Sequence, residues 1–220
     1  MNTKTLFFNE LKPFFKKMGY EFISGFTPKF ILKKDDYVVQ DGFNYLNKEN
    51  KIYGGKLSLS INDIEDIILE IEFPNHDFSS YKNENSNVFL TLGDRWGILN
   101  VTDVELNTEE KIINYANAVK QYIETYGRKF IETYSHLPNI LAEMDKLELE
   151  GKYWNELLSG GPEFLFRGLI ISKLCNDEKY DEKLSYVESL LISMADDFLP
   201  YFEKLKIRLD DLKPKYNLKE

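Results

Sequence analysis

Residues 53–73, YGGKLSLSINDIEDIILEIEF, constrain the fold of this chain most strongly, because apolar and polar side chains alternate along them. Leu57, Leu59 and Ile61 alternate with serines. After a polar break, four more apolar residues stand at every second position: Ile67, Leu69, Ile71 and Phe73. A period of two places successive side chains on opposite faces of a strand. The stretch therefore predicts an antiparallel hairpin with one apolar and one mainly polar face.

The chain before this hairpin predicts one helix and several short strands. Apolar residues recur at spacings of three and four from Phe7 to Met18, so residues 3–18 predict an amphipathic helix that Gly19 ends. The period then changes, and aromatic and β-branched residues predict strands within 20–26, 30–32 and 37–46. Together with the hairpin, these strands form an antiparallel meander.

The chain after the hairpin begins with a polar segment, 74–87, that predicts a long loop. Short strands are expected at 88–92 and 98–101. From Asn107 the pattern is helical, and Asn107 with Glu110 resembles a capping box. The predicted helices cover about 108–134, 138–150, 164–174 and 184–198, with a further apolar stripe after Pro200.

The fold prediction is therefore α+β: an N-terminal helix on an antiparallel meander of five or six strands, followed by a C-terminal helical hairpin or bundle. We expect a sheet domain over 1–106 and a helical region over 107–220. The helical region could also pack on the sheet as one domain.

Composition disfavours several classes of function. The net charge is −9 and the isoelectric point is about 5.0, so a phosphate backbone would be repelled and we expect no nucleic-acid partner. A basic protein partner is electrostatically favoured. Cys175 is the single cysteine, which rules out an intrachain disulfide framework. Charges interrupt every apolar run near the N-terminus, so we expect neither signal peptide nor membrane contact, and a cytoplasmic protein.

Catalytic signatures are missing from the sequence. It contains no G-x-S-x-G, P-loop or G-x-G-x-x-G pattern. With two histidines and one cysteine, a zinc-type site would need carboxylates from distant segments. We therefore expect no cofactor, no metal and no catalytic residue, and a binding protein rather than an enzyme.

The candidate binding residues fall in three places. The polar face of the predicted hairpin carries serines and glutamates, the long loop carries a His-Asp pair, and a glycine-bracketed triplet follows. The triplet is a candidate because Arg and Trp are both enriched at interface hot spots. The candidates are Ser58, Ser60, Glu70, Glu72, His76, Asp77, Asp94, Arg95 and Trp96.

The N-terminal third also resembles a known family. A helix runs from Leu11-Lys12-Pro13 to Lys17-Met18-Gly19-Tyr20, and an aromatic strand at Phe30, a Val38-Val39-Gln40 strand and a one-faced hairpin follow. Over about residues 5–75 this arrangement resembles small bacterial α+β proteins of the polymorphic-toxin immunity type. The resemblance implies a non-enzymatic inhibitor and no catalytic residues.

The sequence thus leads to one hypothesis and two alternatives. The hypothesis is a cytoplasmic binding protein, of immunity type, that presents acidic side chains of the sheet and of residues 74–97 to a basic partner. One alternative is a small-ligand binder or enzyme with a pocket between sheet and helices, lined by residues such as Tyr53, Trp96, Tyr153 and Trp154. The other is a subunit of a homo-oligomer.

Overall fold

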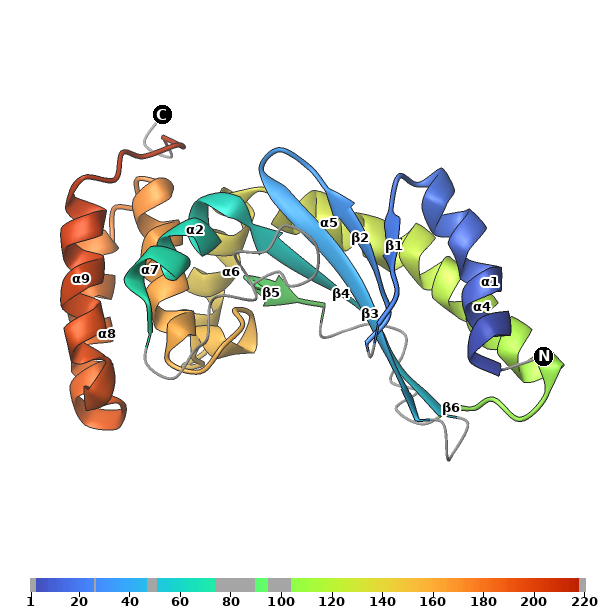
Figure 1. The fold of residues 1–220 in the computed structure, drawn as a ribbon. Coiled ribbons are helices and arrows are strands. Elements are labelled where there is room, and N and C mark those ends of the chain that lie inside the picture. The colour runs from blue at the N-terminus through green and yellow to red at the C-terminus, as the bar shows by residue number, and fades with distance from the viewer. Residues whose placement is uncertain (1–2, 26, 47–50, 74–89, 95–103, 218–220) are drawn as a thin grey trace. The chain divides into compact units, whose positions relative to one another are not determined.

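The computed structural model describes residues 3–25, 27–46, 51–73, 90–94 and 104–217 and shows an α+β chain (Figure 1). Residues 1–59 and 93–133 form one compact unit, and residues 60–92 and 134–220 form a second. The predicted division was at residue 106. Each of the two compact units instead combines residues from before that position with residues from after it. The predicted loop 74–87 and the predicted strand 98–101 lie outside the described residues.

The N-terminal helix and the sheet follow the order predicted from the sequence. Helix α1 (Thr3–Lys17) precedes strands β1 (Glu21–Ile23), β2 (Lys29–Lys33), β3 (Tyr37–Leu46) and β4 (Lys51–Ile61). The six-stranded sheet has the order β1-β2-β3-β4-β5, in which β5 is Leu92–Gly93, and β6 (Val104–Glu105) pairs antiparallel with β4. β1, β2 and β3 pair antiparallel in turn. The predicted α+β class and the antiparallel meander are confirmed.

Aromatic rings build the core of the first unit. Phe15 of α1 stacks on Phe30 of β2 with ring centroids 3.9 Å apart. Helix α4 (Glu109–Tyr122) lies beside α1 (Figure 1), and its Tyr115 stacks on Phe7 with a centroid distance of 5.3 Å. These large apolar side chains are fully removed from water, which is the main favourable term in folding.

The long helix predicted over 108–134 forms with a local change of winding. Thr108 caps it by accepting a hydrogen bond from the backbone amide of Lys111, in place of the predicted Asn107. After α4 the chain passes through a π-helical turn, η1 (Ile123–Gly127), into α5 (Arg128–Tyr134). At Gly127 a Cβ would lie 2.7 Å from Cδ1 of Leu57, so glycine allows the helix to approach β4 closely.

The hairpin prediction is wrong over its second half, which forms helix α2 (Asn62–Ile71). Leu57, Leu59 and Ile61 are buried in β4 as predicted. The following apolar side chains are buried with helical spacing: Ile64, Ile67, Ile68 and Ile71. Acidic residues in the first turn suit the positive end of the helix dipole, and Glu72 ends the helix in the left-handed conformation.

The second unit is built mainly of helices. They are α2, α6 (Leu137–Leu149), the 3-10 turn η2 (Trp154–Glu156), α7 (Glu163–Leu174), α8 (Tyr180–Met194), the 3-10 turn η3 (Asp196–Phe198) and α9 (Leu199–Asp210). α7 is buried on almost every side and is the central helix of this unit. Leu92 of β5 (Leu92–Gly93) forms an isolated antiparallel bridge with Leu158.

Candidate functional site

The predicted binding residues on the hairpin are not gathered on one polar sheet face. Ser58 is half-buried in β4, and Ser60 is buried. Glu70 belongs to α2, where its carboxylate accepts a hydrogen bond of 2.9 Å from Nε of Arg208 in α9. Glu72 is exposed at the end of α2. Because residues 62–71 are helical, the flat acidic surface expected from Ser58, Ser60, Glu70 and Glu72 does not form.

Asp94 is tied into the core of the first unit. Its backbone amide donates to the carbonyl of Leu57 at 2.8 Å, and its carboxylate accepts a short hydrogen bond from the hydroxyl of Tyr122. Burial, together with this bond to Asp94, raises the pKa of Tyr122. His76, Asp77, Arg95 and Trp96 lie outside the described residues, so their part in binding stays a prediction.

The acidity of the chain is concentrated in one unit. Residues 60–92 and 134–220 contain 24 Asp and Glu against 13 Lys and Arg, a formal charge of −11. Residues 1–59 and 93–133 contain 13 Asp and Glu against 15 Lys and Arg, a formal charge of +2. The excess of negative charge therefore belongs to the helical unit and not to the unit that contains the N-terminal strands.

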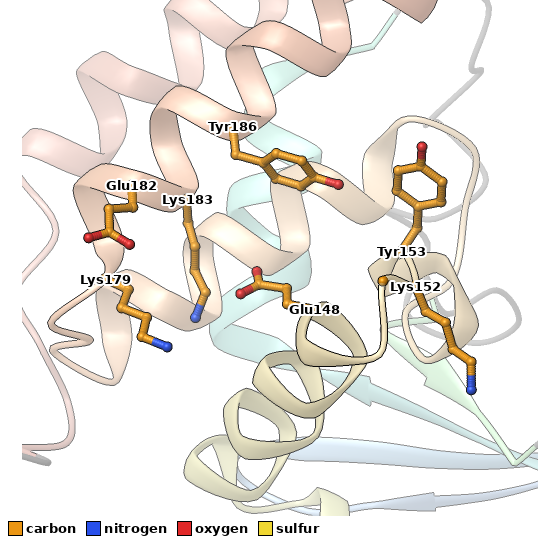
Figure 2. A pocket seen from close by; sticks show the side chains of 8 residues that line it. Glu148, Lys152, Tyr153, Lys179, Glu182, Lys183 and Tyr186 are labelled. Atoms are coloured by element: carbon orange, nitrogen blue, oxygen red, sulfur yellow. The ribbon is translucent and has the colours of Figure 1, made fainter.

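A cavity of about 370 Å³ opens in the helical unit, between the end of α6 and the start of α8 (Figure 2). Figure 2 shows Lys179 and Lys183 on one side and Tyr153 on the other, with Glu148 and Tyr186 opposite each other in the middle. The lining residues are Glu148, Gly151, Lys152, Tyr153, Lys179, Glu182, Lys183 and Tyr186. We call this space the Tyr153/Tyr186 cavity.

Lys183 is the buried charge of this cavity, with only 3% of its surface exposed. Its ammonium group donates to the carboxylates of Asp145 in α6 and Asp177 before α8, the latter at 2.7 Å. Burial by itself lowers the pKa of Lys183, but these hydrogen bonds outweigh burial and raise it. The pKa of Asp177 is lowered, because hydrogen bonds from Lys183 and Ser172 overcome the opposing effect of burial. Lys183 is therefore a stable cation already neutralised by two carboxylates.

Glu148 lies beside Lys183 (Figure 2) and is half-buried. Its Oε1 accepts a hydrogen bond of 3.0 Å from Nε1 of Trp154. Burial raises the pKa of Glu148 despite the nearby Lys183, and Asp145 adds to the increase. The nearby cations and the hydrogen bond from Trp154 thus balance the buried negative charge of Glu148 only in part.

The aromatic wall of the cavity is held by a buried tryptophan. Tyr153 and Tyr186 are 45% and 40% exposed, whereas Trp154 is almost fully buried. Tyr186 meets Trp154 edge to face with ring centroids 6.3 Å apart. The two tyrosines consequently present apolar ring surface and hydroxyl groups to the cavity.

A second hollow, of about 500 Å³, lies at the turn between α7 and α8 and the end of α9. Its charged lining consists of Asp177, Glu178, Asp181, Asp210 and Asp211, with Lys173 and Lys213. Burial first, and then the charges of Asp210 and Asp181, raise the pKa of Tyr180 to about 12. We call this space the acidic hollow. The Lys183–Asp177 ion pair connects it to the Tyr153/Tyr186 cavity, because each residue lines one of the two.

From the sequence, Tyr153 and Trp154 were named for a possible pocket between sheet and helices, but Glu148, Lys183 and Tyr186 were not. Tyr153 lines the present cavity, whereas Trp154 is buried against Tyr186. The available signal was Lys183, which lies one helical turn before the buried Val187 and thus on the buried face of α8. A lysine on an apolar helix face requires carboxylates from neighbouring elements.

Within the described part of the chain, no three His, Cys, Asp or Glu residues are placed to hold a metal ion. Over the same residues, every helix is too short or too polar to cross a bilayer. Comparison with protein-family models, curated proteins and solved structures gave no match to this chain.

Proposed function

We propose that this chain is a non-enzymatic binding protein that holds a basic protein partner on its acidic helical unit. The observation that carries the proposal is the formal charge of −11 on residues 60–92 and 134–220, against +2 on the rest. Complementary charge accelerates encounter and selects against acidic competitors.

The acidic hollow is the contact region that fits this role best. It offers five carboxylates against two lysines, and the carboxylate of Asp177 is neutralised by Lys183. Asp181 in the first turn of α8 and Asp210 at the end of α9 are both exposed. Both carboxylates are open to water, where lysine and arginine side chains of a partner would reach them.

The proposal that the chain is an immunity-type inhibitor rests on the resemblance of residues 5–75 to small bacterial α+β proteins of the polymorphic-toxin immunity type. An inhibitor of this kind acts by covering a functional surface of a toxin, and a basic surface suits the charge of this chain. The proposed contact moves from the sheet face to the helices, because α2 replaces the second strand of the predicted hairpin.

Capture experiments at increasing salt test the charge-driven part. Tagged protein is used as bait in a lysate of its source cells, and bound proteins are identified by mass spectrometry. We expect a basic protein that elutes as salt screens the contact. The variant Asp181→Asn/Asp210→Asn should lose it. The matched variant Glu124→Gln/Glu132→Gln removes the same charge from exposed positions of the other unit and should keep it. Capture of acidic or neutral proteins only, insensitive to salt, would overturn the proposal.

A growth assay tests the immunity type separately. The protein encoded beside this chain in its genome should arrest growth when it is expressed alone, and co-expression with this chain should restore growth. If the neighbouring protein is harmless, or if rescue fails while both proteins are soluble, the immunity type is rejected and the binding function is retained.

A small-ligand binder is the second candidate, and the Tyr153/Tyr186 cavity is the observation that favours it. Its volume of about 370 Å³ falls in the range of small-molecule sites. Such a ligand would bind within the helical unit, and not between sheet and helices as the sequence suggested.

A further inference from the structure

We propose that the Tyr153/Tyr186 cavity accepts one arginine side chain of the basic partner. The inference rests on the proposed function and adds to it a defined recognition site. The guanidinium would lie between the carboxylate of Glu148 and the ring of Tyr186, and its aliphatic stem would enter along Tyr153.

The charge balance of the cavity favours a cation. Glu148 and Glu182 belong to its lining. Of the lining lysines, Lys183 is bound by Asp145 and Asp177, and Lys152 by Glu150 at 2.6 Å. Lining groups and these partners together amount to five carboxylates and three ammonium groups, a net charge of −2. An anionic ligand would have to displace the carboxylates that already occupy Lys152 and Lys183, which leaves Lys179 as the remaining lining cation.

Glu148 supplies the directional contact. Its hydrogen bond from Trp154 uses Oε1, and a carboxylate has about four acceptor sites, so the group can accept further donors. Glu148 is half-buried, and its negative charge is only partly balanced by its neighbours. A bound cation therefore stabilises this carboxylate more than it would stabilise an exposed one. The bond from Trp154 also fixes the orientation in which the carboxylate meets a ligand.

The tyrosines select arginine over lysine. A planar guanidinium stacks on an aromatic face and loses less hydration than an ammonium group. Tyr186 is held by its edge-to-face contact with Trp154, so its ring is positioned before the ligand arrives. Tyr153 and Tyr186 leave about half of their surfaces open for this stacking.

The test titrates N-acetyl-arginine amide into the ¹⁵N-labelled full chain and follows amide chemical shifts. We expect saturable shifts at the end of α6 and the start of α8, with a Kd on the order of 1 mM for a single side chain. Glu148→Gln should weaken binding at least about fivefold, because it removes the charge and keeps an acceptor for Trp154. Tyr186→Ala should weaken it by a similar factor.

Glu203→Gln is the matched control, since Glu203 is an exposed residue of α9 and lies outside the cavity lining; it should change Kd by less than about twofold. N-acetyl-lysine amide should bind more weakly than the arginine compound. Absence of saturable shifts, or equal affinity in Glu148→Gln and wild type, overturns the inference. Tighter binding of an anionic compound, such as N-acetyl-glutamate amide, overturns it as well.

The two proposals fail in different ways. If the arginine compound does not bind but Asp181→Asn/Asp210→Asn still abolishes capture of a basic protein, the cavity proposal fails and the proposed function stands. If the compound binds through Glu148 and no basic protein is captured, a partner is excluded as the source of the cation, and the small-ligand candidate replaces it.

Discussion

The ion pair between Glu65 and Arg167 leads to the sharpest stability prediction, because both side chains are almost fully buried, at 4% and 2% exposure. Arg167 of α7 donates from Nε and Nη2 to the two carboxylate oxygens of Glu65 in α2, at 2.8 and 2.7 Å. Its Nη1 donates to the carbonyl of Ser159 at 2.9 Å. The hydroxyl of Thr91 donates to Glu65 at 2.7 Å and accepts from the amide of Ile61. The network joins three separate segments of the helical unit.

Substituting Arg167 by Met should lower the free energy of unfolding by about 3–5 kcal/mol, because Glu65 keeps its charge and loses its counter-ion in a buried place. A whole domain is stabilised by roughly 5–15 kcal/mol, so the loss is a large share of the total. For a chain of this size it corresponds to a fall in melting temperature of roughly 6–20 °C. The double variant Glu65→Leu/Arg167→Met removes both charges and should lie within about 2 kcal/mol of wild type, with the carbonyl of Ser159 and the hydroxyl of Thr91 accounting for the remaining loss.

Urea unfolding followed by far-ultraviolet circular dichroism measures these differences as changes in midpoint at constant slope. The reasoning is refuted if Arg167→Met costs less than about 1 kcal/mol, the range of an exposed pair. It is refuted equally if the double variant is less stable than the single one, since that result would make the pair a net source of stability.

Three further predictions concern other buried groups. Neither carboxyl oxygen of the fully buried Asp41 has a hydrogen-bond partner among the described residues, and burial raises its pKa, so the folded chain binds this proton more tightly than the unfolded chain and loses stability as pH rises above the ordinary value of 3.8. Asp41→Asn should therefore raise the free energy of unfolding at pH 7 by about 1–3 kcal/mol and flatten the fall in melting temperature as pH rises above 3.8; an unchanged pH profile would contradict this. Gly168→Ala should destabilise the helical unit by about 1–3 kcal/mol in urea unfolding and alter tryptophan fluorescence, because a Cβ would lie 2.2 Å from the ring of Trp154; wild-type stability would show that Trp154 can move aside. Tyr122→Phe leaves the buried Asp94 without its hydroxyl donor and should cost about 1–3 kcal/mol by the same assay, whereas a loss below about 0.5 kcal/mol would show that other contacts of Asp94 suffice.

Much of the fold was determined by local patterns in the sequence. Phe7, Leu11 and Phe15 recur with the period of a helix, and α1 buries all three side chains. The strands β1 to β3 and the long helix from α4 to α5 follow from the same kind of pattern, because each has a single period consistent with one buried face. For these elements, the residues themselves specify both the conformation and the side that meets the core.

Residues 62–73 show where such reasoning ends. Ile67, Leu69 and Ile71 satisfy a period of two, while Ile64, Ile68 and Ile71 satisfy the period of a helix, so this short apolar run is compatible with both. Packing against α7 and α9 decided the outcome, because the helix buries Ile64, Ile67 and Ile68 together. In a strand, Ile67 would lie on one face, and Ile64 and Ile68 would lie on the other.

The candidate site depended on tertiary structure even more strongly. From the sequence, Tyr153 and Trp154 could be named for their aromatic rings, and the acidic total could be counted. The meeting of Glu148 with Lys183 joins residues 35 positions apart on two helices, and no local period encodes that approach. The amino-acid sequence by itself determined which faces are apolar and how much charge the chain carries. Only the packing of α6 and α8 against α7 decided which charges became buried and paired, because burial and pairing are properties of neighbours in space.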